Sequence, residues 1–322
     1  MNEAAIKKEA LFNEVKGSLF EFLVAKNLAL KSCGEFKFLN SIDKNYLAVL
    51  TQQDRLIRQF YPEMLPFLQN VSLLSAEKLF QAIPDSIIDI SLVGKLVNSN
   101  EESDEADVVI SCEKRKVRVS LKLNKQGAYV NTKSGGIKSF FSTYFPFLPS
   151  STQSIFNEFV DVEFNRMAHE LHHRHDLEFN GSFRTWVEAG LSELPGELSN
   201  EDRDNLKSYY SRISFELHRI LKRASEDFPI EFRIALLPIL GFSSEEILQL
   251  ICFHDFKAGG NANVLVHDLN EVRPKLQKLI IRDHQNTASV DFNFGTSDLQ
   301  IRIKPMNKFT TTAIKINCAV RY

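Results

Sequence analysis

The chain has 322 residues, of which 43% are hydrophobic and 26 are Phe, and this composition excludes an intrinsically disordered protein. The formal net charge of -2 excludes a protein whose whole surface is basic enough to coat nucleic acid. No apolar run approaches the roughly 20 residues that span a bilayer, and the N-terminus is charged where a signal peptide is apolar, so we expect a cytoplasmic protein with no membrane partner.

Helices are expected first. Apolar residues from Leu11 to Leu23 recur with a period of 3.6 residues, which predicts a long helix over residues 3–31. More helix is predicted to about residue 83, with breaks near Pro62 and Pro66.

Strands follow the first helical part. IIDISLV, DVVISC and VRVSLKL are short, β-branched and alternating, and EKRK is typical of a turn, so the last two predict a hairpin. Residues 151–255 are again predicted to be helical, including the segment SEEILQLICFHDF. At the C-terminus, SVDFNFG, LQIRIK and AIKINCAVRY predict a β meander.

These elements predict an α+β fold with a large helical insertion. The sequence has no internal repeat and no low-complexity linker, so we expect residues 1–322 to form a single unit. Its consecutive parts would be a helical region 1–83, a hairpin and basic loop 84–148, a second helical region 149–258 and a β-rich region 259–322.

The charges are separated along the chain. Residues 101–107 contain five acids and no base, whereas residues 112–138 contain eight Lys or Arg against one acid. The C-terminal residues 301–322 also contain five Lys or Arg and no acid. Two basic segments of this kind are able to line one groove for an anionic partner.

The predicted hairpin brings Asp107 together with Lys122. Alternation along the second strand places Ser120 and Lys122 on one face, and the fold-back of the first strand brings its start beside them. A carboxylate here can hold a divalent cation, with the carbonyl oxygen of Leu121 as a further ligand. The Lys122 ammonium can orient a water or offset charge that develops on a phosphate. This combination is typical of phosphodiester hydrolysis.

At these residues the chain resembles the PD-(D/E)XK nuclease superfamily, and within it the type II restriction endonucleases. The family places an Asp before an acid-x-Lys tripeptide across a hairpin, and this sequence has Asp107 followed by Ser120-Leu121-Lys122. Serine stands where the family has the acid. The helix segment GSLFEFLVAKNLA resembles the family's helix with an acidic residue, so Glu21 is a candidate to supply the second carboxylate, and Glu105 is another.

The resemblance implies a fold, a cofactor and a partner. It implies a restriction-endonuclease-like core, in which a mixed β-sheet is flanked by helices. It also implies Mg²⁺ held by Asp107, the Leu121 carbonyl and Glu21, with Lys122 as the motif lysine. The expected activity is hydrolysis of a specific site in double-stranded DNA, and cleavage of both strands suits a homodimer.

Two segments are candidate DNA contacts. The loop NKQGAYVNTKSGGIKSFF has glycines that allow close backbone approach and polar side chains that can meet phosphates; these side chains are Lys125, Lys133, Ser134 and Lys138. The segment IRIKPMNKFTTTAIKINCAVRY offers donors for base edges and phosphates; these are Lys304, Asn307, Lys308 and Lys315. The alternatives are a flexible turn for the first segment and a sheet edge guarded by lysines for the second.

A competing motif is HELHH, which fits H-E-x-x-H. On a helix this pattern sets His169 and His173 one turn apart to hold zinc, with Glu170 as a base and Glu188 as a third ligand. It resembles the glutamate-type zinc metallopeptidases, although Arg174 and His175 follow where those enzymes have apolar residues. A DNA-binding protein without catalysis is a third alternative, because Ser120 is also compatible with a lost metal site.

Overall fold

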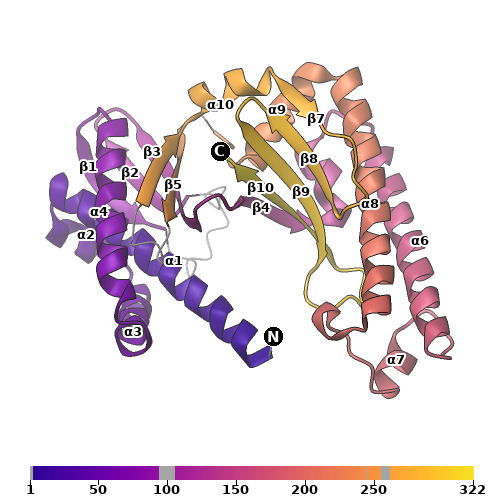
Figure 1. The fold of residues 1–322 in the computed structure, drawn as a ribbon. Coiled ribbons are helices and arrows are strands. Elements are labelled where there is room, and N and C mark those ends of the chain that lie inside the picture. The colour runs from indigo at the N-terminus through magenta and orange to yellow at the C-terminus, as the bar shows by residue number, and fades with distance from the viewer. Residues whose placement is uncertain (1–2, 94–105, 245, 255–261) are drawn as a thin grey trace. The chain divides into compact units, whose positions relative to one another are not determined.

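The computed structural model describes residues 3–93, 106–244, 246–254 and 262–322 (Figure 1). The chain forms two compact units, the first from residues 1–128 and 242–272 and the second from residues 129–241 and 273–322. Each unit is therefore built from two separated stretches, because the chain leaves the first unit after residue 128 and returns to it at residue 242. The four consecutive parts predicted from the sequence do not follow this division.

The helices of the first unit lie in its N-terminal stretch. They are α1 (Glu3–Lys31), α2 (Glu35–Ser41), α3 (Lys44–Phe60) and α4 (Met64–Ala82). Helix α3 begins after Asp43, whose carboxylate accepts hydrogen bonds from the backbone N–H groups of Asn45 and Tyr46 at 2.9 and 3.1 Å. The predicted helices are confirmed, but only one break separates α3 from α4. Pro66 lies in the first turn of α4, where its missing N–H costs no helical hydrogen bond.

A five-stranded mixed sheet completes the first unit. Its strands are β1 (Ile87–Leu92), β2 (Val108–Cys112), β3 (Lys116–Lys125), β5 (Ile247–His254) and β6 (Ala262–His267), in the order β1-β2-β3-β5-β6. All neighbours are antiparallel except β3 and β5, which are parallel with Ser120 opposite Gln249. The predicted β2–β3 hairpin is confirmed.

Helices α1 and α4 pack on this sheet (Figure 1). Val24 of α1 and Leu79 of α4 share one apolar cluster with Ile110 of β2, Val119 of β3 and Leu250 of β5, and all five side chains are fully buried. Burial of apolar surface between the helices and the sheet therefore stabilises the first unit and holds the ends of β2 and β3 in place.

The prediction of a helix for SEEILQLICFHDF was wrong. Residues Ile247–His254 form β5, with every residue buried except Leu248. A strand with neighbours on both sides and both faces covered is apolar throughout, so it lacks the alternation that marks a half-exposed strand. Such a short apolar run cannot be distinguished from a buried helix by its period.

The second unit contains a five-stranded antiparallel sheet and several helices. The strands are β4 (Val130–Gly136), β7 (Leu279–Ile281), β8 (Ser289–Phe294), β9 (Ser297–Pro305) and β10 (Ile314–Arg321), in the order β4-β10-β9-β8-β7. The helices are α5 (Phe140–Tyr144), α6 (Ser151–Arg174), α7 (Arg184–Glu188), α8 (Asn200–Asp227) and α9 (Pro229–Ile239), with 3-10 turns η1 (Ile137–Ser139) and η2 (Pro195–Glu197). Helix α10 (Leu269–Leu276) lies across the boundary of the two units.

In the second unit the long helices α6 and α8 run side by side, and α8 contacts β8 and β9 (Figure 1). The predicted C-terminal meander is confirmed as β8, β9 and β10. The basic loop, however, is largely a strand, because residues Val130–Gly136 pair with β10. The strand could not be recognised from the sequence because it contains two glycines, which are rare in strand interiors.

The two sheets and their helices make the chain an α+β protein. Among the helices of the described residues, none is both long enough and apolar enough to cross a bilayer.

The assignment of β5 to the core makes a stability prediction. Leu250→Ala should lower the free energy of unfolding by about 2–5 kcal/mol, because the fully buried side chain leaves a cavity between α4 and the sheet. Urea unfolding followed by circular dichroism measures this change. The control is Leu73→Ala, at a residue of α4 that is 43% exposed, which should cost about 1 kcal/mol or less. Equal effects of the two changes would contradict a buried β5.

Candidate active site

Asp107 lies immediately before β2, and its backbone is held on both sides. Its N–H donates to the carbonyl of Val119 at 2.9 Å, and its own carbonyl accepts from the N–H of Val93 at 3.0 Å. The side chain is 20% exposed. Two chain segments therefore hold this residue, and its carboxylate projects toward the middle of β3.

Three groups of β3 converge on one oxygen of that carboxylate. Oδ2 of Asp107 accepts a hydrogen bond from the backbone N–H of Leu121 at 2.6 Å, and it lies 3.5 Å from both the hydroxyl of Ser120 and the ammonium of Lys122. The structure thus brings together the Asp and the Lys that the sequence pattern pairs. Because Lys122 is 35% exposed, its ammonium remains accessible to a substrate.

Leu121 has two roles in β3. Its side chain is buried in the apolar cluster beneath α1, which fixes the strand, while its N–H points at Asp107. The N–H and C=O of one residue in an antiparallel ladder face the same neighbouring strand. The Leu121 carbonyl therefore projects to the side on which Asp107 lies, where it is an oxygen ligand available to a cation.

Ser120 is buried and lies on the opposite face of β3 from Leu121. Its hydroxyl brings no charge to the site, so the acid of the acid-x-Lys pattern has no replacement at this position. Its neighbour in the parallel strand is Gln249, which is also buried. Gln249 could not be placed at this site from the sequence, because residues 247–254 are predicted there to be helical.

Tyr46 is a buried residue whose pKa reflects the charges of both Glu21 and Asp107. This tyrosine of α3 is 8% exposed, and burial raises the pKa of its hydroxyl to about 12, with further contributions from the negative charges of Glu21 and Asp107. Both carboxylates therefore act on one buried phenol within the first unit. Nothing in the sequence marked Tyr46. The other candidate carboxylate, Glu105, lies outside the described residues.

These groups suit a hard divalent cation. Mg²⁺ is commonly bound through one or two carboxylates, with waters and substrate phosphates completing its octahedron. Asp107, Glu21 and the Leu121 carbonyl supply only oxygen ligands of this kind. Within the described parts of the chain no three His, Cys, Asp or Glu side chains are placed to hold one metal ion. A site of two carboxylates predicts weak binding of the ion in the absence of substrate.

Most of the predicted DNA contacts belong to the second unit. Lys125 is exposed at the end of β3 in the first unit. Lys133 and Ser134 lie in β4, opposite Cys318 and Asn317 of β10. Lys138 pairs with Asp161 at 2.7 Å, so a phosphate would have to displace this carboxylate.

The C-terminal segment is less basic than its sequence indicates. Lys304 and Lys315 lie directly opposite each other on β9 and β10, an arrangement of like charges that favours a bound anion. Asn307 is exposed after β9, but Lys308 forms an ion pair with Glu193. The segment itself contains no acid, but the fold brings Glu193 to Lys308 from a distant part of the chain.

The HELHH motif lies in the last turns of α6. His169, Glu170 and His173 are exposed and line one surface pocket with Asn205 of α8. Glu170 is bonded to Arg166 at 3.2 Å. Glu188, the predicted third ligand, is exposed on α7 and bonded to Arg184 at 2.7 Å.

His172, which the zinc motif does not use, is the buried histidine of this segment. Its Nδ1 lies 2.8 Å from the carbonyl of Ala168, and because a carbonyl only accepts, Nδ1 carries the proton. The ring packs among Phe179, Phe183 and Trp186. Burial lowers the pKa of His172, so the ring is neutral and serves packing.

No family model matches this chain, and no curated protein and no solved structure matches it either.

The surroundings of HELHH predict its metal content. Purified protein should contain well below one equivalent of tightly bound zinc by atomic emission spectrometry. The reason is that Glu188 is hydrogen-bonded to Arg184 and does not join the two imidazoles as a third zinc ligand. His169→Ala should leave the zinc content unchanged. One equivalent of zinc that is lost in His169→Ala would instead support the peptidase interpretation.

Proposed function

We propose that this protein is a Mg²⁺-dependent endodeoxyribonuclease of the type II restriction endonuclease kind. One observation carries the proposal: the carboxylate of Asp107 lies 3.5 Å from the ammonium of Lys122 and is anchored on the N–H of Leu121 at 2.6 Å. A fixed carboxylate beside an accessible ammonium suits an anionic substrate that approaches together with a cation.

The fold of the first unit supports the same proposal. A restriction-endonuclease-like core is a mixed β-sheet flanked by helices, and the sheet β1-β2-β3-β5-β6 is likewise mixed and is packed against α1 and α4. Asp107 and Lys122 lie at one end of the β2–β3 hairpin, and α1 supplies Glu21. The proposal therefore places every catalytic group within the first unit.

In the proposed reaction a water attacks the phosphorus of a DNA phosphodiester, and one P–O bond breaks with departure of the sugar oxygen. When bound, Mg²⁺ supplies Lewis acidity that offsets the growing negative charge on the phosphate oxygens. Asp107, Glu21 and the Leu121 carbonyl would hold the ion. Lys122 donates hydrogen bonds from its ammonium to the attacking water or to the phosphate.

The proposed partner is double-stranded DNA, with the lysines of β4, β9 and β10 as further contacts. Lys304 and Lys315 support this part of the proposal, because their unfavourable cross-strand neighbourhood is relieved by a phosphate. A homodimer is proposed because the two strands of a duplex are related by a two-fold axis, which a two-fold symmetric enzyme matches.

A non-catalytic DNA-binding protein is the second candidate, and Ser120 is the observation that favours it. The hydroxyl at this position removes a charge from the proposed metal site, which a protein that only binds DNA would tolerate. The two candidates differ in whether Mg²⁺ causes strand cleavage.

The first test removes the two central groups. Asp107→Ala and Lys122→Ala should each reduce Mg²⁺-dependent cleavage of a plasmid substrate by at least about 100-fold, because a metal ligand or a charge-stabilising donor is lost. DNA affinity without Mg²⁺ should remain within a few-fold of the parent. Lys114→Ala, at an exposed turn residue of the same hairpin, is the matched control and should cut normally. Cleavage by either site variant at the parent rate would refute the assignment.

The second test concerns Glu21. If this residue replaces the missing acid, Glu21→Gln should raise the Mg²⁺ concentration needed for half-maximal cleavage by about tenfold or more, because one of two carboxylate ligands is neutralised. Thermal denaturation should show that the variant remains folded. Glu14→Gln, at an exposed position of the same helix, is the control. An unchanged Mg²⁺ requirement would leave the second carboxylate to Glu105.

A further inference from the structure

Helix α1 contributes a buried lysine to the first unit. Lys16 is only 9% exposed, and within the described residues its ammonium forms no ion pair or hydrogen bond. Its neighbour is an aromatic ring, since Nζ lies 5.8 Å from the centre of Phe12. An ammonium removed from water costs free energy unless it is paired, so a residue of this kind indicates a role that compensates for that cost.

The fold directs a second lysine to the same place. Side chains of β3 alternate between the faces of the sheet, so Lys125 shares the face of Leu121 and Leu123. That face is covered by α1, because Leu121 and Leu123 pack in the cluster that contains Val15, the residue before Lys16. Lys125 is exposed at the end of the strand and is therefore open to solvent.

The electrostatics agree with this placement. Burial lowers the pKa of Lys16, and the positive charge of Lys125 lowers it further. Two like charges that repel each other, one of them buried, are together an unfavourable arrangement in the free protein. A doubly coordinated anion reverses the sign of this interaction, because each ammonium then has an opposite charge at hydrogen-bond distance.

We infer that Lys16 and Lys125 form a binding site for a backbone phosphate of the DNA that the proposed active site cleaves. This inference rests on the proposed function, which it extends to a specific contact of the first unit with the DNA backbone. Lys125 follows Lys122 by three residues of strand, or about 10 Å, and projects from the opposite face of β3. The phosphate held here is therefore a different one from the reacting phosphate.

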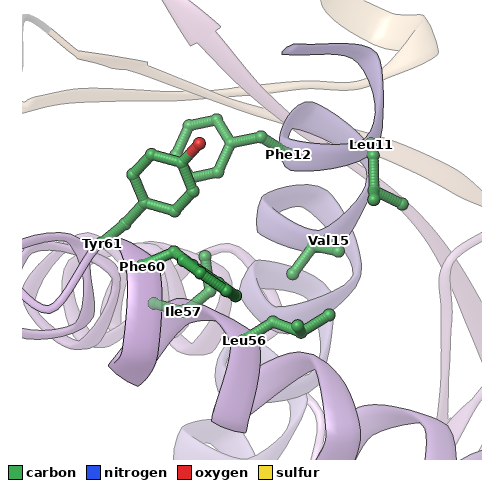
Figure 2. Close-up of a pocket in the computed structure, with 7 residues that line it drawn as sticks. All are labelled: Leu11, Phe12, Val15, Leu56, Ile57, Phe60 and Tyr61. Atoms are coloured by element: carbon green, nitrogen blue, oxygen red, sulfur yellow. The ribbon is translucent and has the colours of Figure 1, made fainter. Parts of the chain in front are cut away.

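The apolar surroundings of α1 explain how Lys16 is held. Figure 2 shows Leu11, Phe12 and Val15 of α1 facing Leu56, Ile57, Phe60 and Tyr61 around a pocket lined only by these side chains. The ring of Phe12 also lies 4.1 Å from that of Tyr61. This packing fixes Phe12, and Phe12 in turn limits where the Lys16 ammonium can lie. The lysine is therefore preorganised, which reduces the entropy lost when a phosphate binds.

The experiment measures duplex binding without cleavage. Fluorescence anisotropy of a labelled duplex in EDTA, at several salt concentrations, is compared for the parent, Lys16→Met, Lys125→Met and Lys116→Met. The first two variants should bind several-fold more weakly, and the slope of log Kd against log salt should fall by about 0.9 for each lost phosphate contact. Lys116→Met removes an exposed lysine at the other end of β3 and should match the parent.

Thermal stability gives an independent measurement. Methionine preserves the aliphatic stem of Lys16 and removes the buried charge, so Lys16→Met should raise the melting temperature while it weakens DNA binding. A purely structural lysine would show a lower melting temperature and unchanged binding. That result would overturn the inference.

The remaining outcomes separate this site from the proposed function. If the parent binds and cleaves DNA but Lys16→Met and Lys125→Met bind with the affinity and salt slope of Lys116→Met, the phosphate site is refuted and the nuclease stands. If the parent binds no duplex, both fall together. Inorganic phosphate that stabilises the parent but not Lys16→Met, with DNA binding unchanged in that variant, would assign the pair to a free anion and also overturn the inference.

Discussion

The hydrogen bond from the backbone N–H of Leu121 to the carboxylate of Asp107 determines the geometry of the proposed site. The β2–β3 ladder ends where the N–H of Asp107 donates to the carbonyl of Val119. The next N–H of β3 that points toward β2 is that of Leu121, and no residue of β2 lies opposite it to accept a hydrogen bond. The Asp107 side chain provides that acceptor. A charged acceptor makes a stronger bond than a carbonyl, and this bond holds the carboxylate against β3 with Lys122 beside it.

This arrangement depends on a strand from far along the chain. Strand β3 would be an edge strand without β5, which returns to the first unit after residue 241 and pairs with β3 in parallel. Leu121 of β3 and Leu250 of β5 are buried in the apolar cluster that the sheet shares with α1 and α4. The long excursion through the second unit supplies the crossover that parallel strands require. Residues 129–241 of the second unit are therefore inserted into the connection between two adjacent strands, and the remainder of that unit follows in residues 273–322.

The lysines of this protein differ in their electrostatic surroundings. Lys138 and Lys308 have carboxylate partners in Asp161 and Glu193. Lys16 instead experiences the like charge of Lys125. Counting charges along the sequence treats all of these residues alike, whereas binding of an anion costs less where no existing ion pair has to break. The distribution of partners, more than the number of lysines, identifies the places where a phosphate is expected.

The sequence alone determined the local features of this protein. The period of α1, the alternation of β2 and β3, and the turn between them follow from short-range sterics and burial, so the approach of Asp107 to Lys122 was predictable. Tertiary structure decided the rest. The strand character of residues 247–254, the pairing of β4 with β10 and the proximity of Tyr46 to Glu21 and Asp107 depend on contacts between residues distant in the chain. A local sequence pattern contains no information about such contacts, because a short buried apolar segment has a similar composition whether it forms a strand or a helix.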